Sequence, residues 1–542
     1  MDAGSEPQET VQNGTELFAT LTAGSVVWPS DCPDGRVNFR HAGDCALLIA
    51  ATALTRFAFR SHFLYDIDSV NFALALQRFD PSVHQPHPPG YFLYVCLGKL
   101  SNAVFHDANV ALVAISILAS CGTVVMIYLL ASTWFASTSF GRPAAAFAGL
   151  IFVCSPLAWF HGTVALTYIV EAFFSVCVGY FCWRIYSGAI LFIFPAAAAL
   201  GLATGFRQSS LVVLAPLFLF SIRRAPRRLA LLGIGVLGLV LVAWFIPMLY
   251  AASGPHAYMS SLWSLWRLVP ARQTVFTSSV FTSLARVCLI VAICALSFGP
   301  AIVLPLCASK SANERVKIFT WIWLAPGLLL FTFVYLKFVN SGYLLVLLPP
   351  ACAWLGFWAA NWYNTSSLSA VMKVVLLIAA VALNCAIFLR APLYFSYREV
   401  QRSEQELAAT VKDVRQIANP EETIIVGFDS HFLGYRHAGY YLPEYLTIQF
   451  PEVPLASSTG VFTMRHQDTR LVNRISIGSF RDFLLFPLPA PDQEYLTYMQ
   501  HIQARFPPGE LHVTALNGRE FLTGPVSALP LLFPNAIALE AR

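Results

Sequence analysis

Residues 65–94 read YDIDSVNFALALQRFDPSVHQPHPPGYFLY and directly follow a hydrophobic segment. The stretch combines a rigid proline-rich turn with three aspartates and two histidines: Asp66, Asp68, Asp80, His84 and His87. Polar groups at this density are costly to keep beside a membrane segment unless they are used. The stretch therefore predicts a functional site at the surface of a membrane-embedded fold.

The composition excludes a soluble globular protein. Of the 542 residues, 57% are hydrophobic and 12% charged, whereas about 25% of the residues in soluble domains are charged. The net charge of +5 comes from short basic clusters between apolar runs, which is typical of membrane topology rather than nucleic-acid binding. The twelve cysteines form no CxxC pair and no zinc spacing, which favours packing roles. We therefore predict a polytopic membrane protein with an appended polar domain.

Apolar runs of roughly 17–25 residues mark membrane spans, and the sequence contains about eleven. No signal peptide begins at Met1, so the first run is expected to be an uncleaved span. The run at 280–308 is long enough to contain a break at Gly299–Pro300. The predicted spans lie near residues 43–60, 108–134, 143–159, 164–183, 188–206, 209–222, 229–251, 280–308, 317–336, 341–359 and 370–391.

The basic residues orient these spans, because cytoplasmic loops carry an excess of Lys and Arg. With eleven spans and a cytoplasmic start, every basic cluster between spans faces the cytoplasm: Arg36 with Arg40, Arg142, Arg223 to Arg228, and Lys310 to Lys317. The same count places residues 65–94 and everything after Pro392 outside. We expect a cytoplasmic segment (1–40), a transmembrane module (41–392) with an external loop (61–107), and an extracytoplasmic α/β domain (393–542).

The polar stretches contain predicted elements of their own. Ser69–Phe79 and Gly90–Leu100 have the features of short interfacial helices, the second too short to span. In the tail, Gln401–Ile417 predicts an amphipathic helix, and three segments predict strands: Thr423–Gly427, Tyr445–Gln449 and Phe480–Pro487.

The two aspartates of the Asp-x-Asp motif are the first candidates for chemistry. In an extended segment, Asp66 and Asp68 point to the same side. They can then hold a divalent cation such as Mg²⁺ or Mn²⁺, or one can act as a general base while the other tunes it. Helix capping is the structural alternative. His84 and His87 sit on a turn that can aim an imidazole at a phosphate, the alternative being a turn with incidental histidines.

Further candidates lie in and between the later spans. Glu171 is an ionisable residue near the outer end of a span, with Tyr168 one turn before it, and the alternative is a snorkelling carboxylate. Arg207 is a lone external arginine between apolar helices, which predicts an anion partner: Glu171, Asp66 or a substrate phosphate.

Three more cations are expected on the external side. Arg267 and Arg272 belong to a tryptophan-flanked loop that can contact lipid phosphates, with interfacial anchoring as the alternative. Lys337 lies near the start of the tenth span. Together these groups predict a site for an anionic leaving group carried on a lipid.

The order of motifs resembles a known group of enzymes. A first span followed by Asp-x-Asp, an interfacial helix and His-Pro-Pro-Gly resembles the membrane glycosyltransferases with the GT-C fold. The group includes protein O-mannosyltransferases, aminoarabinose transferases and bacterial Rgt-type enzymes. The resemblance covers about residues 40–390, and three further segments fit it: TVALTYIVEAFF at 163–174, GLATGFRQSS at 201–210 and GYLLVLLPP at 342–350.

The resemblance implies a lipid-linked sugar donor, a polyprenyl phosphate, used outside the cytoplasm. An acceptor hydroxyl attacks the anomeric carbon with inversion, and the lipid phosphate leaves. It implies that Asp66 is the base, with Asp68 as runner-up or metal partner. Arg207, His87, Lys337 and the motif that contains Tyr343 then bind or neutralise the phosphate, and Glu171 orients the acceptor or the arginine. Metal dependence varies across such enzymes, so the Asp-x-Asp motif alone does not decide whether a divalent metal is bound.

One departure and two alternatives remain. Asn340-Ser341-Gly342 stands where the group carries an arginine before the late tyrosine. The alternatives are a transporter or flippase of lipid-linked saccharides, which predicts charges deep within several spans, and a non-catalytic membrane scaffold. For the enzyme, the acceptor can be a protein, lipid A, or a cell-wall or capsule glycan. The expected location is a bacterial inner membrane, with the site facing the periplasm or exterior.

Overall fold

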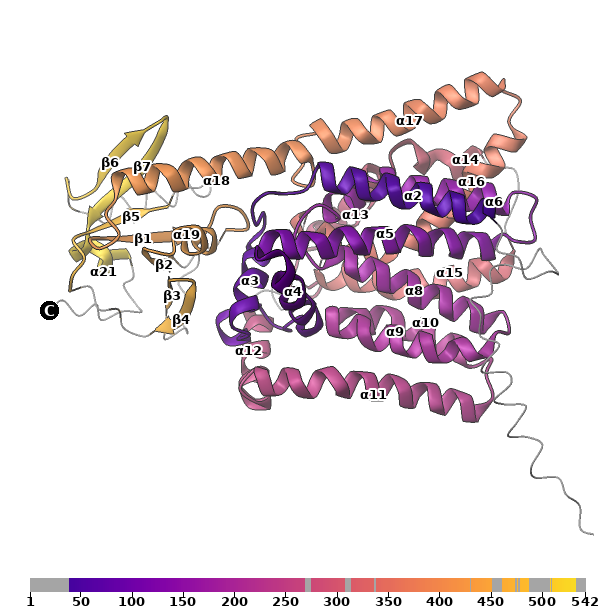
Figure 1. Cartoon of the computed structure of the whole chain (residues 1–542), viewed down its shortest axis with the longest axis horizontal. Coiled ribbons are helices and arrows are strands. Elements are labelled where there is room, and N and C mark those ends of the chain that lie inside the picture. The colour runs from indigo at the N-terminus through magenta and orange to yellow at the C-terminus, as the bar shows by residue number, and fades with distance from the viewer. Residues whose placement is uncertain are drawn as a thin grey trace, which may run out of the picture.

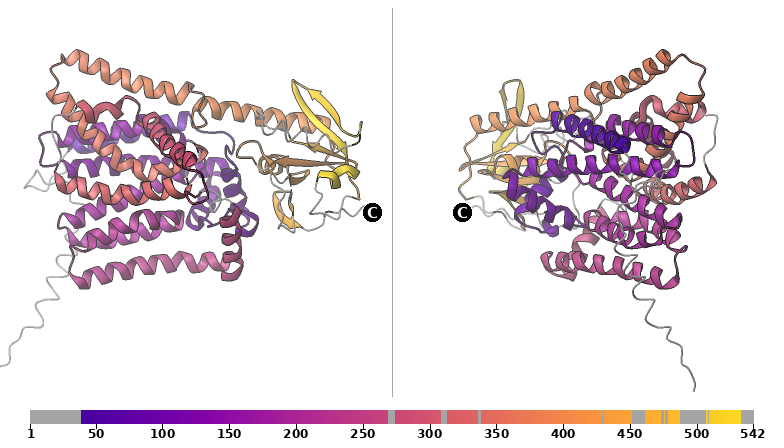
Figure 2. Two further views of the ribbon diagram at one scale, coloured as in Figure 1. Left: turned by 180° about the vertical axis from the view of Figure 1, so that it is seen from behind. Right: turned by 45° about the vertical axis from the view of Figure 1, so that its right-hand side comes forward.

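The computed structural model of the protein describes residues 39–268, 274–307, 313–335, 338–428, 430–450, 461–472, 475, 478–486, 507 and 509–532. A bundle of roughly parallel helices is joined to a smaller unit built on a β-sheet (Figure 1). Two short helices from the first loop lie between them, as further views of the ribbon confirm (Figure 2).

The helices of the bundle follow the apolar runs of the sequence. Their bounds are α2 Phe39–Ala58, α5 Ala108–Trp134, α6 Gly141–Cys154, α8 Tyr168–Tyr186, α9 Ile193–Phe206, α10 Ser209–Ile222, α11 Arg227–Ala251, α13 Val280–Phe298, α14 Leu304–Cys307, α15 Glu314–Leu330, α16 Leu348–Thr365 and α17 Ala370–Arg390. The predicted break at Gly299–Pro300 is confirmed, because α13 ends at Phe298 and a short 3-10 turn follows. Proline there cannot donate the next helical hydrogen bond.

Seven helical stretches of the described chain are long and apolar enough to cross a membrane: 108–134, 168–186, 227–251, 280–307, 314–334, 341–365 and 370–390. The shorter apolar helices α6, α9 and α10 run alongside them, as does α2 (Figure 1). The chain is thus a polytopic helical membrane protein. Its core is one continuous apolar cluster through the bundle.

The first loop folds at the end of the bundle that faces the sheet (Figures 1 and 2). It forms α3 (Ile67–Gln77), a 3-10 turn (Pro81–Val83) and α4 (Phe92–Phe105). The two short helices predicted around residues 69–79 and 90–100 are therefore confirmed, although α4 extends to Phe105. Helix α12 (Pro255–Leu268) lies at the same end and contacts the 3-10 turn.

The C-terminal unit is a mixed seven-stranded sheet with strand order β4-β3-β2-β1-β5-β7-β6. Strands β2 and β5 pair with β1 in parallel, and the remaining pairs are antiparallel. The strands are β1 Thr423–Phe428, β2 Leu446–Phe450, β3 Val461–Arg465, β4 Asp468–Val472, β5 Asp482–Leu485, β6 His512–Leu516 and β7 Arg519–Pro525. The three predicted strands correspond to β1, β2 and β5.

Two helices connect this sheet to the bundle. The predicted amphipathic helix is α18 (Tyr397–Ile417), which follows α17 closely in the chain and packs Leu407 and Val414 into the core on one face of the sheet. Helix α19 (Tyr435–Tyr441) contacts β1, β2 and α3. The loop that carries Asp66 is thus held between the bundle and the sheet.

Candidate functional site

Asp66 and Asp68 lie at the start of α3. Asp66 is the N-cap: its backbone is extended, and its carboxylate accepts a hydrogen bond from the Asp68 amide at 2.8 Å. The expectation that both lie in an extended segment is wrong, because Asp68 already belongs to the first helical turn. A carboxylate at the N-cap satisfies an otherwise unpaired helical N–H group, so capping and proximity of the two acids occur together.

The surroundings shift the pKa values of the two carboxyl groups in opposite directions. Burial and the neighbouring Asp68 carboxylate raise the pKa of Asp66 to about 6. Burial also opposes ionisation of Asp68, but the charge and hydrogen bond of His87 outweigh it and lower the pKa of Asp68 to about 2. Two carboxyl groups with separated pKa values are typical of a site that assigns them different tasks. Asp66 is the one that can exchange a proton near neutral pH.

His87 connects the proline-rich turn to this pair. Its Nδ1 lies 3.1 Å from the Asp68 carboxylate, and its Nε2 lies 3.0 Å from the Tyr91 hydroxyl. Gly90, with a φ of +108°, closes the turn before α4 in a conformation that favours glycine. His84 points elsewhere: its ring lies against Phe462 of β3, with 5.5 Å between ring centroids.

Glu171 and Arg207 form a buried ion pair. Arg207 follows α9, and its Nε lies 3.1 Å from the Glu171 carboxylate, with side chains 5% and 0% exposed. The snorkelling interpretation of Glu171 is therefore wrong. Arg207 also donates to the Thr167 hydroxyl at 3.0 Å, and Ser210 donates to Glu171 at 3.0 Å. The pair can stay ionised there because each partner has further hydrogen bonds.

Aromatic rings enclose the Arg207 guanidinium. Its central carbon lies 4.2 Å from the ring centres of Tyr168 and Tyr343 and 5.7 Å from that of Tyr91. Gly342 permits this packing, because a Cβ there would lie 2.5 Å from the Tyr168 ring. Cation–π contacts of a shielded arginine are favourable. The carboxylate pair and the arginine pair are thereby joined through Tyr91, which contacts both His87 and Arg207.

Some candidates stay apart from this cluster. Arg267 is exposed at the end of α12, 4.9 Å above the Trp263 ring, which agrees with interfacial anchoring. Arg272 and Lys337 lie outside the described residues. Within the described part of the chain, no three His, Cys, Asp or Glu side chains are grouped to hold a metal ion. The binding of a metal ion by Asp66 and Asp68 stays a prediction, and no step of the reaction is assigned to a metal.

Sequence reasoning missed several residues of the cluster. Tyr91 directly follows the His-Pro-Pro-Gly turn, and that position was the one available signal. His161 is 1% exposed, and its ring packs 4.9 Å from Tyr168. His431 comes from the C-terminal unit: its Nδ1 lies 4.0 Å from the Asp66 carboxylate, and its carbonyl accepts the Ile67 amide at 2.9 Å. No local pattern predicts a contact between such distant segments.

Comparisons with known proteins agree with this geometry. Residues 81–230 match the model of the protein O-mannosyl-transferase TMEM260 N-terminal domain, a range that includes Glu171 and Arg207. No curated protein sequence matches the chain.

Two crystal structures of ArnT from Cupriavidus metallidurans share the fold. The structure bound to undecaprenyl phosphate has a TM-score of 0.53 and 13% identity, and the apo structure has 0.56 and 14%. Each likeness covers 90% of this chain and 99% of the other. The resemblance predicted from the sequence is therefore confirmed. The chain thus has the fold of ArnT, and its residues 81–230 are similar to the N-terminal domain of the protein O-mannosyl-transferase TMEM260.

Proposed function

We propose that the protein transfers a sugar from a polyprenyl-phosphate donor to an acceptor hydroxyl outside the cytoplasm. The observation that carries this proposal is the partly buried Asp66 carboxyl group at the start of α3, which lies beside the charge of Asp68 and has its pKa raised to about 6. Such a group can take a proton at neutral pH. The ArnT structure bound to undecaprenyl phosphate supports the class of donor.

The reaction is a single displacement. Asp66 accepts the proton of the acceptor hydroxyl while its oxygen bonds to the anomeric carbon of the sugar. The bond from that carbon to the phosphate oxygen breaks, and its electron pair leaves with the polyprenyl phosphate. Attack opposite the leaving group inverts the configuration.

Positive charge near the leaving phosphate lowers the barrier, because negative charge develops there. We assign this task to Arg207, which acts as a fixed charge, and to His87. Tyr168, Tyr343 and Tyr91 form the wall around Arg207. Glu171 keeps the guanidinium in place. Lipid phosphates around the site are proposed to bind the external cations Arg267, Arg272 and Lys337. His84 is proposed to support the turn.

The topology proposed from the basic clusters fits the helices. Adding α2, α6, α9 and α10 to the seven long stretches gives eleven spans. The first loop and the C-terminal unit, which begins near residue 393, then lie outside the cytoplasm. We propose that the bundle spans a bacterial inner membrane and that the site faces the periplasm. Tyr91 contacts both His87 and Arg207, so the carboxylate pair and the arginine pair form one polar cluster beside the first loop, which favours an enzyme over a flippase.

The test of this function is a donor assay. The purified protein in liposomes is supplied with radiolabelled polyprenyl-phosphate mannose or polyprenyl-phosphate aminoarabinose, together with bacterial envelope extract as acceptor. We expect label in the acceptor and release of free polyprenyl phosphate. Transfer from nucleotide sugars alone would contradict the donor class. Movement of intact lipid-linked sugar across the bilayer, without cleavage, would establish the flippase instead.

The activity is expected to depend on pH through Asp66. A base works only when deprotonated, and the pKa of Asp66 is raised to about 6. The apparent kcat/KM should therefore fall about tenfold for each pH unit below that value and level off above it. The measurement is a pH–rate profile from about pH 4.5 to 8. A flat profile down to the acid end would exclude Asp66 as the base.

A further inference from the structure

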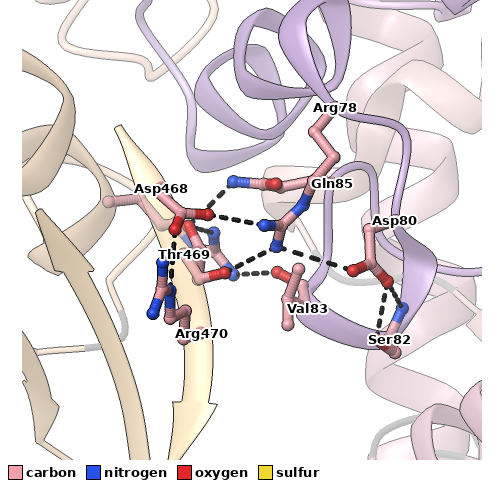
Figure 3. A network of polar contacts seen from close by, with 9 residues as sticks. Arg78, Asp80, Ser82, Val83, Gln85, Asp468, Thr469 and Arg470 are labelled. Carbon is pink, nitrogen blue, oxygen red and sulfur yellow. Dashed lines mark hydrogen bonds and ion pairs between the residues drawn. The ribbon is translucent and has the colours of Figure 1, made fainter. Parts of the chain in front are cut away.

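The C-terminal unit contacts the first loop along a polar seam. At the surface, Arg78 donates to the Asp468 carboxylate at 2.5 Å and to the Thr469 carbonyl at 2.7 Å (Figure 3). Arg78 also approaches Asp80 at 3.5 Å. These groups are partly exposed, so they contribute little to stability. They nevertheless join β4 to the C-terminal end of α3, where Arg78 is the C-cap.

A second layer of the seam is buried. Arg436 on α19 is 1% exposed; its Nη2 donates to the Val83 carbonyl at 2.7 Å and its Nη1 to the Thr469 hydroxyl at 3.1 Å. Gln85, also 1% exposed, donates to the same hydroxyl at 2.8 Å. Figure 3 shows how Val83, Gln85 and Thr469 converge. Arg436 thus joins the 3-10 turn that precedes the proline-rich turn to strand β4, with one hydrogen bond to Val83 and one to Thr469.

Arg436 is a costly residue to bury at this position. Burying a guanidinium costs several kcal/mol unless it is paired, and no ion pair to Arg436 occurs in the described part of the chain. Its partners there are the neutral Val83 carbonyl and Thr469 hydroxyl, with the Tyr435 ring 4.9 Å away. The two groups that the guanidinium connects explain this arginine better than a contribution to folding does.

The turn that Arg436 holds leads directly to the site. Val83 and Gln85 precede His87, whose imidazole contacts Asp68 and Tyr91. Helix α19 also contacts the other side of the same loop: the Nε2 of His437 lies 3.3 Å from the Tyr65 carbonyl, next to Asp66. The C-terminal unit therefore contacts the first loop at two places, one just before Asp66 and one just before His87.

We infer that Arg436 is a positioning residue for sugar transfer, acting through the turn that carries His87. The inference rests on the proposed function. A shift of about 1 Å in a reacting group can cost on the order of 100-fold in rate, so a loosened turn should reduce turnover without removing any group that contacts the substrate.

The experiment is a double-mutant cycle in the full-length protein. Arg436→Met, His87→Ala and the double variant are compared by kcat with radiolabelled polyprenyl-phosphate sugar, alongside melting temperature in detergent. Arg436→Met keeps an unbranched apolar stem but loses the guanidinium group and both of its hydrogen bonds. Arg470→Ala is the matched control, because Arg470 lies on the same strand as Thr469, is 71% exposed and contacts Asp468.

We expect Arg436→Met to lower kcat about tenfold or more, and the double variant to be no worse than the poorer single one, because both changes act on one element. Arg470→Ala should behave as wild type. The inference would be overturned if the fold-loss of kcat in the double variant equalled the product of the two single losses. An unchanged kcat in Arg436→Met would also overturn it. If Arg436→Met does not fold, Thr469→Val replaces it in the cycle with His87→Ala. Thr469→Val removes only the hydroxyl that Arg436 and Gln85 share, and the same outcomes decide the inference. An inactive wild type would instead overturn the proposed function, and the inference with it.

Discussion

Replacing Asp66 by asparagine is expected to lower kcat by roughly 10³-fold, within the range that a general base contributes. Asparagine keeps the shape and can still accept the hydrogen bond from the Asp68 amide, now at 2.8 Å, so α3 keeps its cap. Only the ability to take a proton disappears. The measurement is the initial rate of label transfer from polyprenyl-phosphate sugar, with the variant's melting temperature as the record of folding.

The control for this prediction is Asp107→Asn. Asp107 is exposed and caps α5 by accepting a hydrogen bond from the Val110 amide at 2.8 Å, so the same chemical change occurs at a cap outside the site. We expect wild-type turnover. Asp68→Asn should also impair transfer, because His87 loses its carboxylate partner. If Asp66→Asn and Asp68→Asn both transfer sugar at the wild-type rate, the proposed mechanism is wrong.

Replacing Glu171 by glutamine is expected to destabilise the bundle by about 3 kcal/mol or more, because a buried charge loses its partner. Both side chains are nearly inaccessible to water, and the guanidinium lies among tyrosine rings. The Ser210 hydroxyl can still donate to the amide oxygen, so the loss is electrostatic. The measurement is thermal unfolding in detergent at a fixed scan rate.

The test of this explanation is compensation. Combining Glu171→Gln with Arg207→Met removes both charges, and we expect the double variant to regain much of the lost stability. Glu314→Gln is the control, since Glu314 is 76% exposed and pairs with Lys317 at the surface, where little change is expected. A double variant that is less stable than Glu171→Gln would contradict the ion-pair account.

The transmembrane part of the fold could be predicted because its determinants are local. A run of apolar residues of sufficient length specifies a helix in a membrane, and Gly299–Pro300 specifies a break, whatever the neighbouring helices are. The same local logic located α3, α4 and α18. The extended interpretation of Asp-x-Asp failed for a local reason as well: Asp66 is a strong N-cap, so Asp68 enters the helix.

The assembled site could be predicted only as a list of residues. The sequence named Asp66, His87, Glu171 and Arg207 as candidates, but it left three possible partners for Arg207. The choice of Glu171 depends on the packing of α8 against α9 and α10. Tyr91 and Arg436 were missed because an aromatic residue at a helix start and an arginine in a polar tail have many ordinary uses.

The seam between the first loop and α19 has a consequence for biosynthesis. Arg436 and Val83 are 353 residues apart in the chain. At about 5–20 residues per second, ~20–70 s separate the synthesis of the loop from that of its partner. The first loop is synthesised long before the sheet exists, so the aspartates cannot reach their final arrangement until the C-terminal unit has been made. A growing chain of this design is therefore expected to stay inactive until its C-terminal unit has been synthesised and has folded against the first loop.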